Sequence, residues 1–241
     1  LSEQTNFYQN IYAYDNKEYD RNYPFAAKEY DKSNMGLVMK QGSSGLMYQL
    51  NSHPKEYEYG FNGPWGEVKK YSVTESGTLN YKGSYPEKSL TTKITKQPVT
   101  DFEKSILIEY YDANENLIAR EQHISMQDRR ITYYIYDDLG HLRYVLPPSA
   151  NIQATTSPDQ LPEDCFYYEY DEYNHICKQY IPGASYTLFL YDKRGRLVMK
   201  QNGEQRKNRQ WTLTKYDIFD RPIMEGIYSG GTYETHKAAL A

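Results

Sequence analysis

A Tyr-Asp pair that recurs with the same downstream spacing is the feature that most constrains how this chain can fold. In the clearest copies, Gly follows Asp after three residues and Leu after five, as in Asp137–Leu142 and Asp192–Leu197. Self-similarity of this kind is typical of an array built from one repeated supersecondary unit. The copies lie at Tyr111-Asp112, Tyr136-Asp137, Tyr170-Asp171, Tyr191-Asp192 and Tyr216-Asp217.

The spacing within each copy predicts a tight hairpin turn. Asp at the first position of a type I turn accepts hydrogen bonds from backbone N–H groups two residues further on. The residue three after Asp then needs φ > 0, which favours Gly, then Asn or Asp. The weakest copy has Glu115 at this position. We therefore expect structural turn roles for Asp112, Asp137, Gly140, Asp171, Asn174, Asp192, Gly195, Asp217 and Asp220.

The residues that flank the turns alternate as β-strands do, for example in Ile131–Tyr136 and Phe166–Tyr170. The sequence therefore predicts an all-β fold in which consecutive antiparallel hairpins form an extended, curved sheet. Strand content should exceed the ordinary share of about 20–25%. Helix is expected only at His236–Leu240. The predicted hairpins cover 106–120, 131–146, 165–181, 186–201 and 211–227.

The first hundred residues contain a degenerate version of the pattern. Leu37–Gln41 is identical to Leu197–Gln201 and also follows a Tyr-Asp pair, but its turn is one residue longer and must differ in geometry. Further hairpins are expected over Glu56–Val73 and Thr78–Thr95. The predicted organisation is one continuous unit with degenerate hairpins over 1–104, repeat hairpins over 105–228 with a loop at 147–164, and a tail at 229–241.

Tyrosine supplies much of the apolar bulk of this chain. Its 241 residues include 28 Tyr but 7 Phe and 2 Trp, while Leu, Ile, Val and Phe together make up about 18%. Tyr favours strands, and its ring can pack while its hydroxyl stays hydrated. We therefore expect an ordered but thin-cored β structure with both sheet faces partly hydrated.

Charge and hydropathy exclude two classes of function. The net charge of -4 provides no basic surface for nucleic acid. Mean hydropathy is -0.89, and no stretch approaches the roughly 18 apolar residues that a membrane-spanning helix needs. Leu1–Asn6 lacks the basic and apolar regions of a signal peptide. Neither nucleic-acid binding nor membrane insertion is expected.

The chain has two cysteines, Cys165 and Cys177, twelve residues apart in neighbouring predicted strands. A disulfide across the hairpin and two free thiols are both compatible with this spacing, and free thiols are favoured. Neither cysteine belongs to a CxxC pair, to a cluster with His, or to a nucleophile motif. We therefore expect neither a metal site nor a catalytic thiol.

Two histidines stand at equivalent positions of the repeat. His141 and His175 occupy the place that Arg196 and Arg221 hold in other copies, so we interpret them as polar residues leaving a turn. The repeated aspartates resemble paired glycosidase carboxylates only superficially, because catalysis needs one pair rather than a series. No phosphate-binding, dinucleotide or metalloprotease motif occurs. The sequence predicts no catalytic, metal-binding or cofactor-binding residue, and no cofactor.

Exposed aromatic side chains leave one alternative function open. Aromatic faces on a sheet can stack on sugar rings, and Trp65, between Pro64 and Gly66, is the candidate glycan-binding residue. Ordinary cross-strand pairing is the favoured interpretation of the tyrosines.

The chain resembles the RHS/YD-repeat family, whose unit is a Tyr-Asp, two variable residues and Gly-Arg-Leu. Tyr191–Leu197 fits that unit in full, and Tyr136–Pro148, Lys178–Ala184 and Phe219–Gly226 are similar to a bacterial RHS-repeat subgroup. The resemblance covers about residues 20–230 and is strongest from residue 130 onward. It implies a long β-sheet that spirals into a hollow shell, enclosing a C-terminal effector region in toxin-associated members and presenting adhesion surfaces in animal relatives.

The resemblance implies a non-enzymatic structural shell segment of a larger bacterial protein that is exported or lies at the cell surface. Its partners would be the remaining segments of the parent polypeptide. The core region at which some members cleave themselves has no matching segment, and no effector domain is present, so neither activity is carried over. The alternative is a carbohydrate- or protein-binding module that uses exposed Tyr and Trp.

Overall fold

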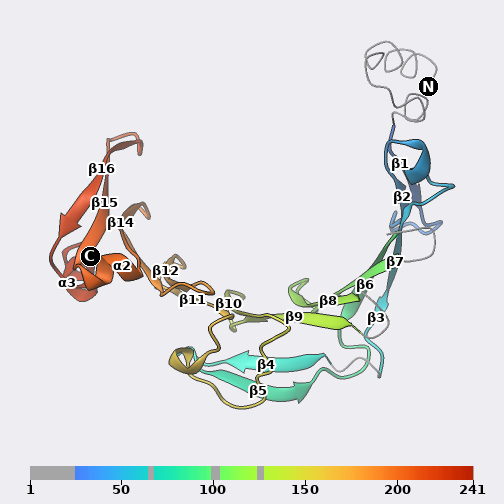
Figure 1. Ribbon diagram of the computed structural model, residues 1–241, viewed down its shortest axis with the longest axis horizontal. Helices are drawn as coiled ribbons and strands as arrows, with labels where there is room; N and C mark the ends of the chain where they lie inside the picture. The colour runs from blue at the N-terminus through green and yellow to red at the C-terminus, as the bar shows by residue number, and fades with distance from the viewer. Residues whose placement is uncertain (1–24, 65–67, 99–103, 124–127, 241) are drawn as a thin grey trace, which may run out of the picture. The chain divides into compact units, whose positions relative to one another are not determined.

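The computed structural model describes residues 25–64, 68–98, 104–123 and 128–240 (Figure 1). Strands make up 48% of these residues and helices 9%. This strand content is about twice the ordinary share. The predicted all-β class is confirmed.

Fourteen strands of the described residues form one antiparallel sheet, in the order β1-β2-β3-β6-β7-β8-β9-β10-β11-β12-β13-β14-β15-β16. A second, two-stranded sheet contains β4 and β5. The strands of the large sheet are β1 (Ala27–Tyr30), β2 (Val38–Gly42), β3 (Lys55–Phe61), β6 (Thr91–Pro98), β7 (Lys104–Tyr111), β8 (Leu117–His123), β9 (Arg129–Tyr136), β10 (Leu142–Leu146), β11 (Phe166–Tyr170), β12 (Ile176–Tyr180), β13 (Thr187–Tyr191), β14 (Leu197–Gln201), β15 (Gln210–Tyr216) and β16 (Pro222–Ser229).

The five hairpins expected from the Tyr-Asp pairs are all present. They are β7–β8, β9–β10, β11–β12, β13–β14 and β15–β16, each antiparallel. In β13–β14, the register shifts between Leu190 and Tyr191, so that Tyr191 faces Leu197 across the turn. A shift in register beside the turn is the mark of a bulge. The repeat therefore encodes hairpins with a bulge in the outgoing strand, opposite the Tyr of each pair.

The hairpins predicted at Glu56–Val73 and Thr78–Thr95 are wrong. β3 pairs with β6, while β4 (Lys69–Val73) and β5 (Leu79–Ser84) pair with each other. The chain therefore leaves the large sheet after β3, forms a separate hairpin, and returns at β6 (Figure 1).

Asn62 explains why the sheet can be interrupted here. Its side chain, which is 2% exposed, donates to the carbonyl of Pro86 over 2.7 Å and accepts from the N–H of Leu90 over 2.7 Å. Its backbone N–H also donates to the carbonyl of Leu90. One buried amide thus ties together the two points at which the chain leaves and re-enters the sheet, so that β3 and β6 pair across the insertion.

The identical segments Leu37–Gln41 and Leu197–Gln201 occupy different registers. The backbone N–H of Asp31 bonds to the carbonyl of Leu37, six residues on, whereas each repeat turn closes over four residues. The turn is therefore two residues longer rather than the one expected. Val38, not Leu37, faces Tyr30 across the hairpin. A one-residue offset exchanges the two faces of a strand, so the same five residues are presented differently.

The chain divides into two compact units, residues 1–68 with 85–131 and residues 69–84 with 132–241. In the second unit, the β4–β5 hairpin is attached through tyrosine hydroxyls. Tyr71 donates to the carbonyl of Ile152 over 3.0 Å, and Tyr144 donates to the carbonyl of Gly77. These hydroxyls explain how Tyr can replace aliphatic residues in a core, because the ring is buried while the polar tip is satisfied. The largest buried side chains of this unit are Leu79, Tyr144, Leu146, Cys165 and Trp211.

Short helices complete the fold. Beyond the expected C-terminal helix, which is longer than predicted as α3 (Tyr233–Leu240), there is α2 (Gly203–Lys207). A capping box formed by Asn202 and Gln205 begins α2. In α3, Tyr233 and Leu240 pack against the buried cluster of Leu190, Met199 and Trp211. Two single turns of 3-10 helix lie at Leu46–Tyr48 and Pro158–Gln160.

Candidate functional site

Each repeat turn is closed by the carboxylate of its aspartate. At Asp192, Oδ1 accepts hydrogen bonds from the backbone N–H of Arg194 over 2.9 Å and of Arg196 over 3.1 Å. The N–H of Asp192 itself donates to the carbonyl of Arg196. The same pair of bonds to Oδ1 occurs at Asp112, Asp137, Asp171 and Asp217.

The third residue after each aspartate has the left-handed conformation that the sequence predicts. The φ angle is 83° at Gly140, 67° at Asn174, 74° at Gly195 and 64° at Asp220. Glu115, in the weakest copy, also has φ of 63°. This conformation is costly for a residue with a long side chain, so the Asp112 turn is held by its hydrogen bonds despite an unfavourable residue.

A second set of contacts links each turn to the next hairpin. The hydroxyl of Tyr191 donates to the carbonyl of Ile176 over 3.1 Å, and its ring stacks on His175 at a centroid distance of 4.6 Å. We call this arrangement a tyrosine stitch. The Tyr of one Tyr-Asp pair donates to the carbonyl of the fifth residue after the Asp of the previous pair, and its ring stacks on the side chain of the fourth residue after that Asp. Two further stitches join Tyr170 to Leu142 and His141, and Tyr216 to Leu197 and Arg196.

The side chain beneath each tyrosine is held by the second oxygen of the turn aspartate. Arg196 binds Oδ2 of Asp192 at 2.5 and 2.8 Å, and His175 Nδ1 lies 3.2 Å from Oδ2 of Asp171. Asp therefore serves two functions, closing its own turn with Oδ1 and orienting the stacking side chain with Oδ2. The sequence placed these residues correctly at turn exits but did not predict the stacking. The signal that could have revealed it is a ring or guanidinium at the fourth position of every strong copy.

The stitches add bonds where the sheet has few. Between β12 and β13, which belong to different hairpins, paired residues are limited to Lys178 with Leu188 and Gln179 with Thr187. Within a hairpin, pairing extends over at least four residue pairs in β11–β12 and β13–β14. Near the turns, therefore, neighbouring hairpins are joined by side chains: the tyrosines of the stitches and, between the last two turns, Arg194 and Arg196, which both pair with Asp220.

Hydrogen bonding lowers the pKa of the turn carboxylates of Asp137 and Asp192. Burial acts to raise the pKa of Asp192, but hydrogen bonds from the Arg196 side chain and from the backbone outweigh it and lower the value. At Asp137, burial is likewise outweighed by bonds from the His141 backbone and from Arg143. These aspartates are charged at neutral pH and engaged in local contacts, which suits turn closure rather than proton transfer.

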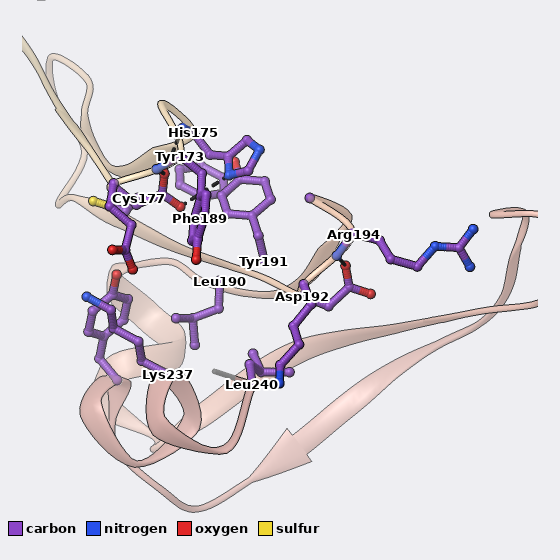
Figure 2. A pocket seen from close by; sticks show the side chains of 15 residues that line it. Tyr173, His175, Cys177, Phe189, Leu190, Tyr191, Asp192, Arg194, Lys237 and Leu240 are labelled. Carbon is purple, nitrogen blue, oxygen red and sulfur yellow. Dashed lines mark hydrogen bonds and ion pairs between the residues drawn. The ribbon is translucent and has the colours of Figure 1, made fainter.

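A pocket of about 670 Å³ lies beside two successive turns. Figure 2 shows Tyr173, His175 and Tyr191 on one side, with Lys237 and Leu240 of α3 on the other. The pocket also includes polar and apolar side chains from β12, β13 and the 192–195 turn. The arrangement combines aromatic surfaces with charged groups, as a binding site for a polar ligand requires.

The cysteines are poor candidates for nucleophiles. Both are free thiols, so of the two alternatives left by the sequence the structure shows the second. Burial raises the pKa of Cys165 to about 12 and also raises the pKa of Cys177, which lines the pocket. The reactive species is the thiolate, and both groups therefore remain protonated at neutral pH.

The remaining candidates considered from the sequence are the glycan-binding Trp65, a metal site and a membrane-spanning helix. Trp65 lies outside the described residues. Across the described ranges, no group of three or more His, Cys, Asp or Glu side chains is arranged to hold a metal ion. Within the same ranges, none of the helices has the length and apolar character needed to cross a membrane.

No protein-family model matches the chain, and no curated protein does. Among solved structures, a crystal structure of TcdB2-TccC3 has a TM-score of 0.47 and 16% identity, the match covering 85% of this chain and 10% of that one. A structure of TcdB2-TccC3 without its hypervariable C-terminal region has a TM-score of 0.45 and 15% identity, the match covering 84% of this chain and 10% of the other. The TcdB2-TccC3-Cdc42 structure gives 0.44 and 15%, covering 86% and 11%.

The chain thus spans about a tenth of the length of the structures that it matches.

Proposed function

We propose that this RHS-like chain is a non-enzymatic structural segment of a larger protein, in which its sheet forms a curved wall that encloses or presents other parts of the polypeptide. The observation that supports this most directly is the series of tyrosine stitches at Tyr170, Tyr191 and Tyr216. They repeat one set of contacts from hairpin to hairpin. A site for catalysis needs one distinctive cluster, whereas a wall needs the same contact many times.

The parent protein is proposed to be bacterial and exported or located at the cell surface, in keeping with the sequence resemblance. Its remaining segments are the proposed partners, and no cofactor is required. The repeat region and the degenerate N-terminal hairpins would serve as one continuous structural unit in that setting.

Limited proteolysis of the full parent polypeptide tests enclosure. We expect segments outside this chain to resist protease, and to be cleaved faster when Tyr191→Phe and Tyr216→Phe together remove two stitches. The matched control is Tyr173→Phe, whose side chain is 73% exposed. Equal cleavage of those segments in the parent protein and when they are expressed alone would contradict the proposal.

A hydrolase screen on glycan, peptide and ester substrates tests the absence of catalysis. We expect no turnover that depends on Asp192. Activity abolished by Asp192→Asn in a protein that stays fully folded would refute the non-enzymatic assignment.

The pocket supports a second candidate function, a carbohydrate-binding module. Tyr173 is 73% exposed at its edge, and the carboxylates of Asp171 and Asp192 lie near. Such aromatic and polar groups suit a sugar ring. A glycan array with Tyr173→Ala as the control tests this function. Binding of a glycan by the protein but not by the variant would support it. If no glycan binds, the structural function is the one that remains. Trp65 is a further proposed contact for the same function.

A further inference from the structure

The pocket beside α3 differs from the rest of the repeat in the charges that its two turns contribute. The residue directly after the turn aspartate is Glu172 in one lining turn and Lys193 in the other. The equivalent residues of the three other copies are Ala113, Asp138 and Ile218. Lys193 therefore gives this pocket a basic group that the other turns lack at the same position.

The helix α3 supplies a second ammonium group. Tyr233 and Leu240 hold α3 against the sheet by packing on the buried cluster described above. Lys237 lies four residues after Tyr233 and three before Leu240, a spacing that places the three side chains on one side of a helix. All three line the pocket, on the wall opposite Tyr173 and His175 (Figure 2). The packing of α3 therefore fixes the place of a cation across from an aromatic surface.

These two ammonium groups are available to a ligand, whereas the aspartates of the pocket are engaged. Across the part of the chain that the structure describes, neither Lys193 nor Lys237 forms an ion pair or a side-chain hydrogen bond. Asp171 and Asp192 use one carboxylate oxygen for the backbone of their own turns and the other for the stacking side chain. The pocket therefore offers charged donors and has few acceptors left.

The remaining charged side chains of the lining do not reverse this balance. Arg194 pairs with Asp220 over 2.9 Å. Glu172 is exposed and has no ion pair among the described residues, so one carboxylate is left against two ammonium groups. A neutral sugar needs acceptors for its hydroxyl groups. A carboxylate needs donors instead, and charge-assisted hydrogen bonds are about twice as strong as neutral ones.

We propose that this pocket binds an acidic sugar, with its ring on the aromatic wall and its carboxylate at Lys193 and Lys237. The exposed ring of Tyr173 provides a surface against which the C–H groups of a sugar can pack. The volume of about 670 Å³ lies within the range of about 300–1,000 Å³ that is usual for small-ligand sites. The inference deepens the carbohydrate-binding function proposed for the same pocket and rests on it, because it names the class of glycan.

A comparison of two matched ligands tests the role of the carboxylate. The probes are a trisaccharide of galacturonic acid and its methyl ester, which keeps the rings but removes the charges. Isothermal titration calorimetry with the 241-residue chain gives both affinities. We expect the acid to bind about threefold to tenfold more tightly than the ester. This difference should shrink as salt is added, because salt screens charges near the surface. Acetate, a carboxylate without a sugar ring, serves as a third ligand and should bind far more weakly.

Variants of the protein assign the carboxylate to its partners. Lys193→Ala and Lys237→Ala should each weaken the acid about threefold to tenfold and leave the ester unchanged. Glu172→Gln should strengthen the acid about twofold, because a repulsive charge is removed. Tyr173→Ala should weaken both ligands alike, since both retain the sugar ring. Lys215→Ala, at an exposed lysine of β15 outside the pocket, is the matched control. The substituted side chains are exposed, so the variants should remain folded, which thermal unfolding verifies.

The outcomes separate this inference from the functions on which it rests. Equal affinity for acid and ester would overturn it while leaving carbohydrate binding in place. Acetate that binds as tightly as the trisaccharide would overturn it by showing a carboxylate site without sugar recognition. Unchanged binding of the acid in both lysine variants would also overturn it. If neither trisaccharide binds, the inference and carbohydrate binding both fail, and the structural function is still measured independently by proteolysis.

Discussion

The side chain of a single aspartate closes each turn and also positions the residue that the next hairpin packs against. At Asp192 these tasks fall to different oxygens, Oδ1 for the backbone of Arg194 and Arg196 and Oδ2 for the Arg196 guanidinium. Because the two oxygens have separate partners, substitutions can separate the two contributions to stability.

Asp192→Ala should lower the free energy of unfolding by about 1–2 kcal/mol, as when a capping side chain is lost. Asp192→Asn should lower it by about half as much, because the amide oxygen still accepts the two backbone bonds while the ion pair is lost. Urea denaturation of both variants measures the difference. Equal destabilisation by Asn and Ala would show that the backbone bonds contribute little.

Acid should weaken these turns in a defined range. The pKa values of Asp137 and Asp192 lie below the ordinary 3.8. A lowered folded-state pKa means that the stabilisation is complete above the unfolded-state value, about 3.9, and is lost as pH falls through the lower folded value. The free energy of unfolding should therefore decline from about pH 4 downward, with a shallower slope in Asp192→Asn. An unchanged slope in that variant would argue against a contribution from Asp192.

Gly195 and Gly140 form a matched pair for measuring crowding at the turn. Both have positive φ, but a Cβ atom at Gly195 would lie 3.1 Å from Nε2 of His175, whereas nothing lies within 4 Å at Gly140. Each substitution to Val should destabilise by about 1–3 kcal/mol through backbone strain. Gly195→Val should cost more, because it also disturbs the ring on which Tyr191 stacks. Thermal unfolding of the two variants makes the comparison, and a larger loss at Gly140 would contradict the expected role of His175.

At the scale of strands and hairpins, the sequence predicted the pairings set by residues within one turn and missed those set by residues far apart in the chain. The five repeat hairpins follow from residues within each turn, such as Asp192 and Gly195, which determine geometry over a few positions. The pairing of β3 with β6 depends instead on Asn62, whose partners lie more than twenty residues away. The alternation of residues along the strands could not show whether two strands that follow each other in the sequence pair directly or are separated in the sheet by an inserted hairpin. The pocket was not foreseen either, because α3 reaches it from a distant part of the sequence.

The tyrosine stitch is the element-scale contact most open to measurement. Tyr191→Phe should keep the stack on His175 but remove the 3.1 Å bond to Ile176, at a cost of about 0.5–1.5 kcal/mol. Tyr173→Phe, at an exposed position, should have no measurable effect. Hydrogen exchange near Ile176 should accelerate only in the first variant. Identical behaviour of both variants would mean that the hydroxyl adds no stability between hairpins.

At the scale of the whole molecule, buried tyrosines contribute so much to the core of the described residues that folding stability should fall at alkaline pH. Burial raises the pKa values of Tyr71, Tyr144 and Tyr167 well above the ordinary 10.0. A raised folded-state pKa means that the stabilisation is intact below the unfolded-state value, about 10, and is lost as pH rises toward the folded values.

Titration followed by tyrosinate absorbance should therefore show two phases. Tyrosines with the ordinary pKa of about 10 should ionise first, and the buried group of Tyr71, Tyr144 and Tyr167 should ionise later, together with the loss of circular dichroism. The control is the same titration in denaturant, where one phase is expected. A single phase near pH 10 in a protein that stays folded would contradict the burial of these rings.

The insertion between β3 and β6 also affects the order in which the chain can assemble during synthesis. The second strand of each repeat hairpin follows the first within a few residues, whereas β6 begins thirty residues after the end of β3. At a translation rate of about 5–20 residues per second, β3 has an unpaired edge for about 2–6 seconds before its partner emerges. Its sequence, Lys-Glu-Tyr-Glu-Tyr-Gly-Phe over 55–61, carries three charged residues, and charges of this kind keep a waiting edge from pairing with another nascent chain.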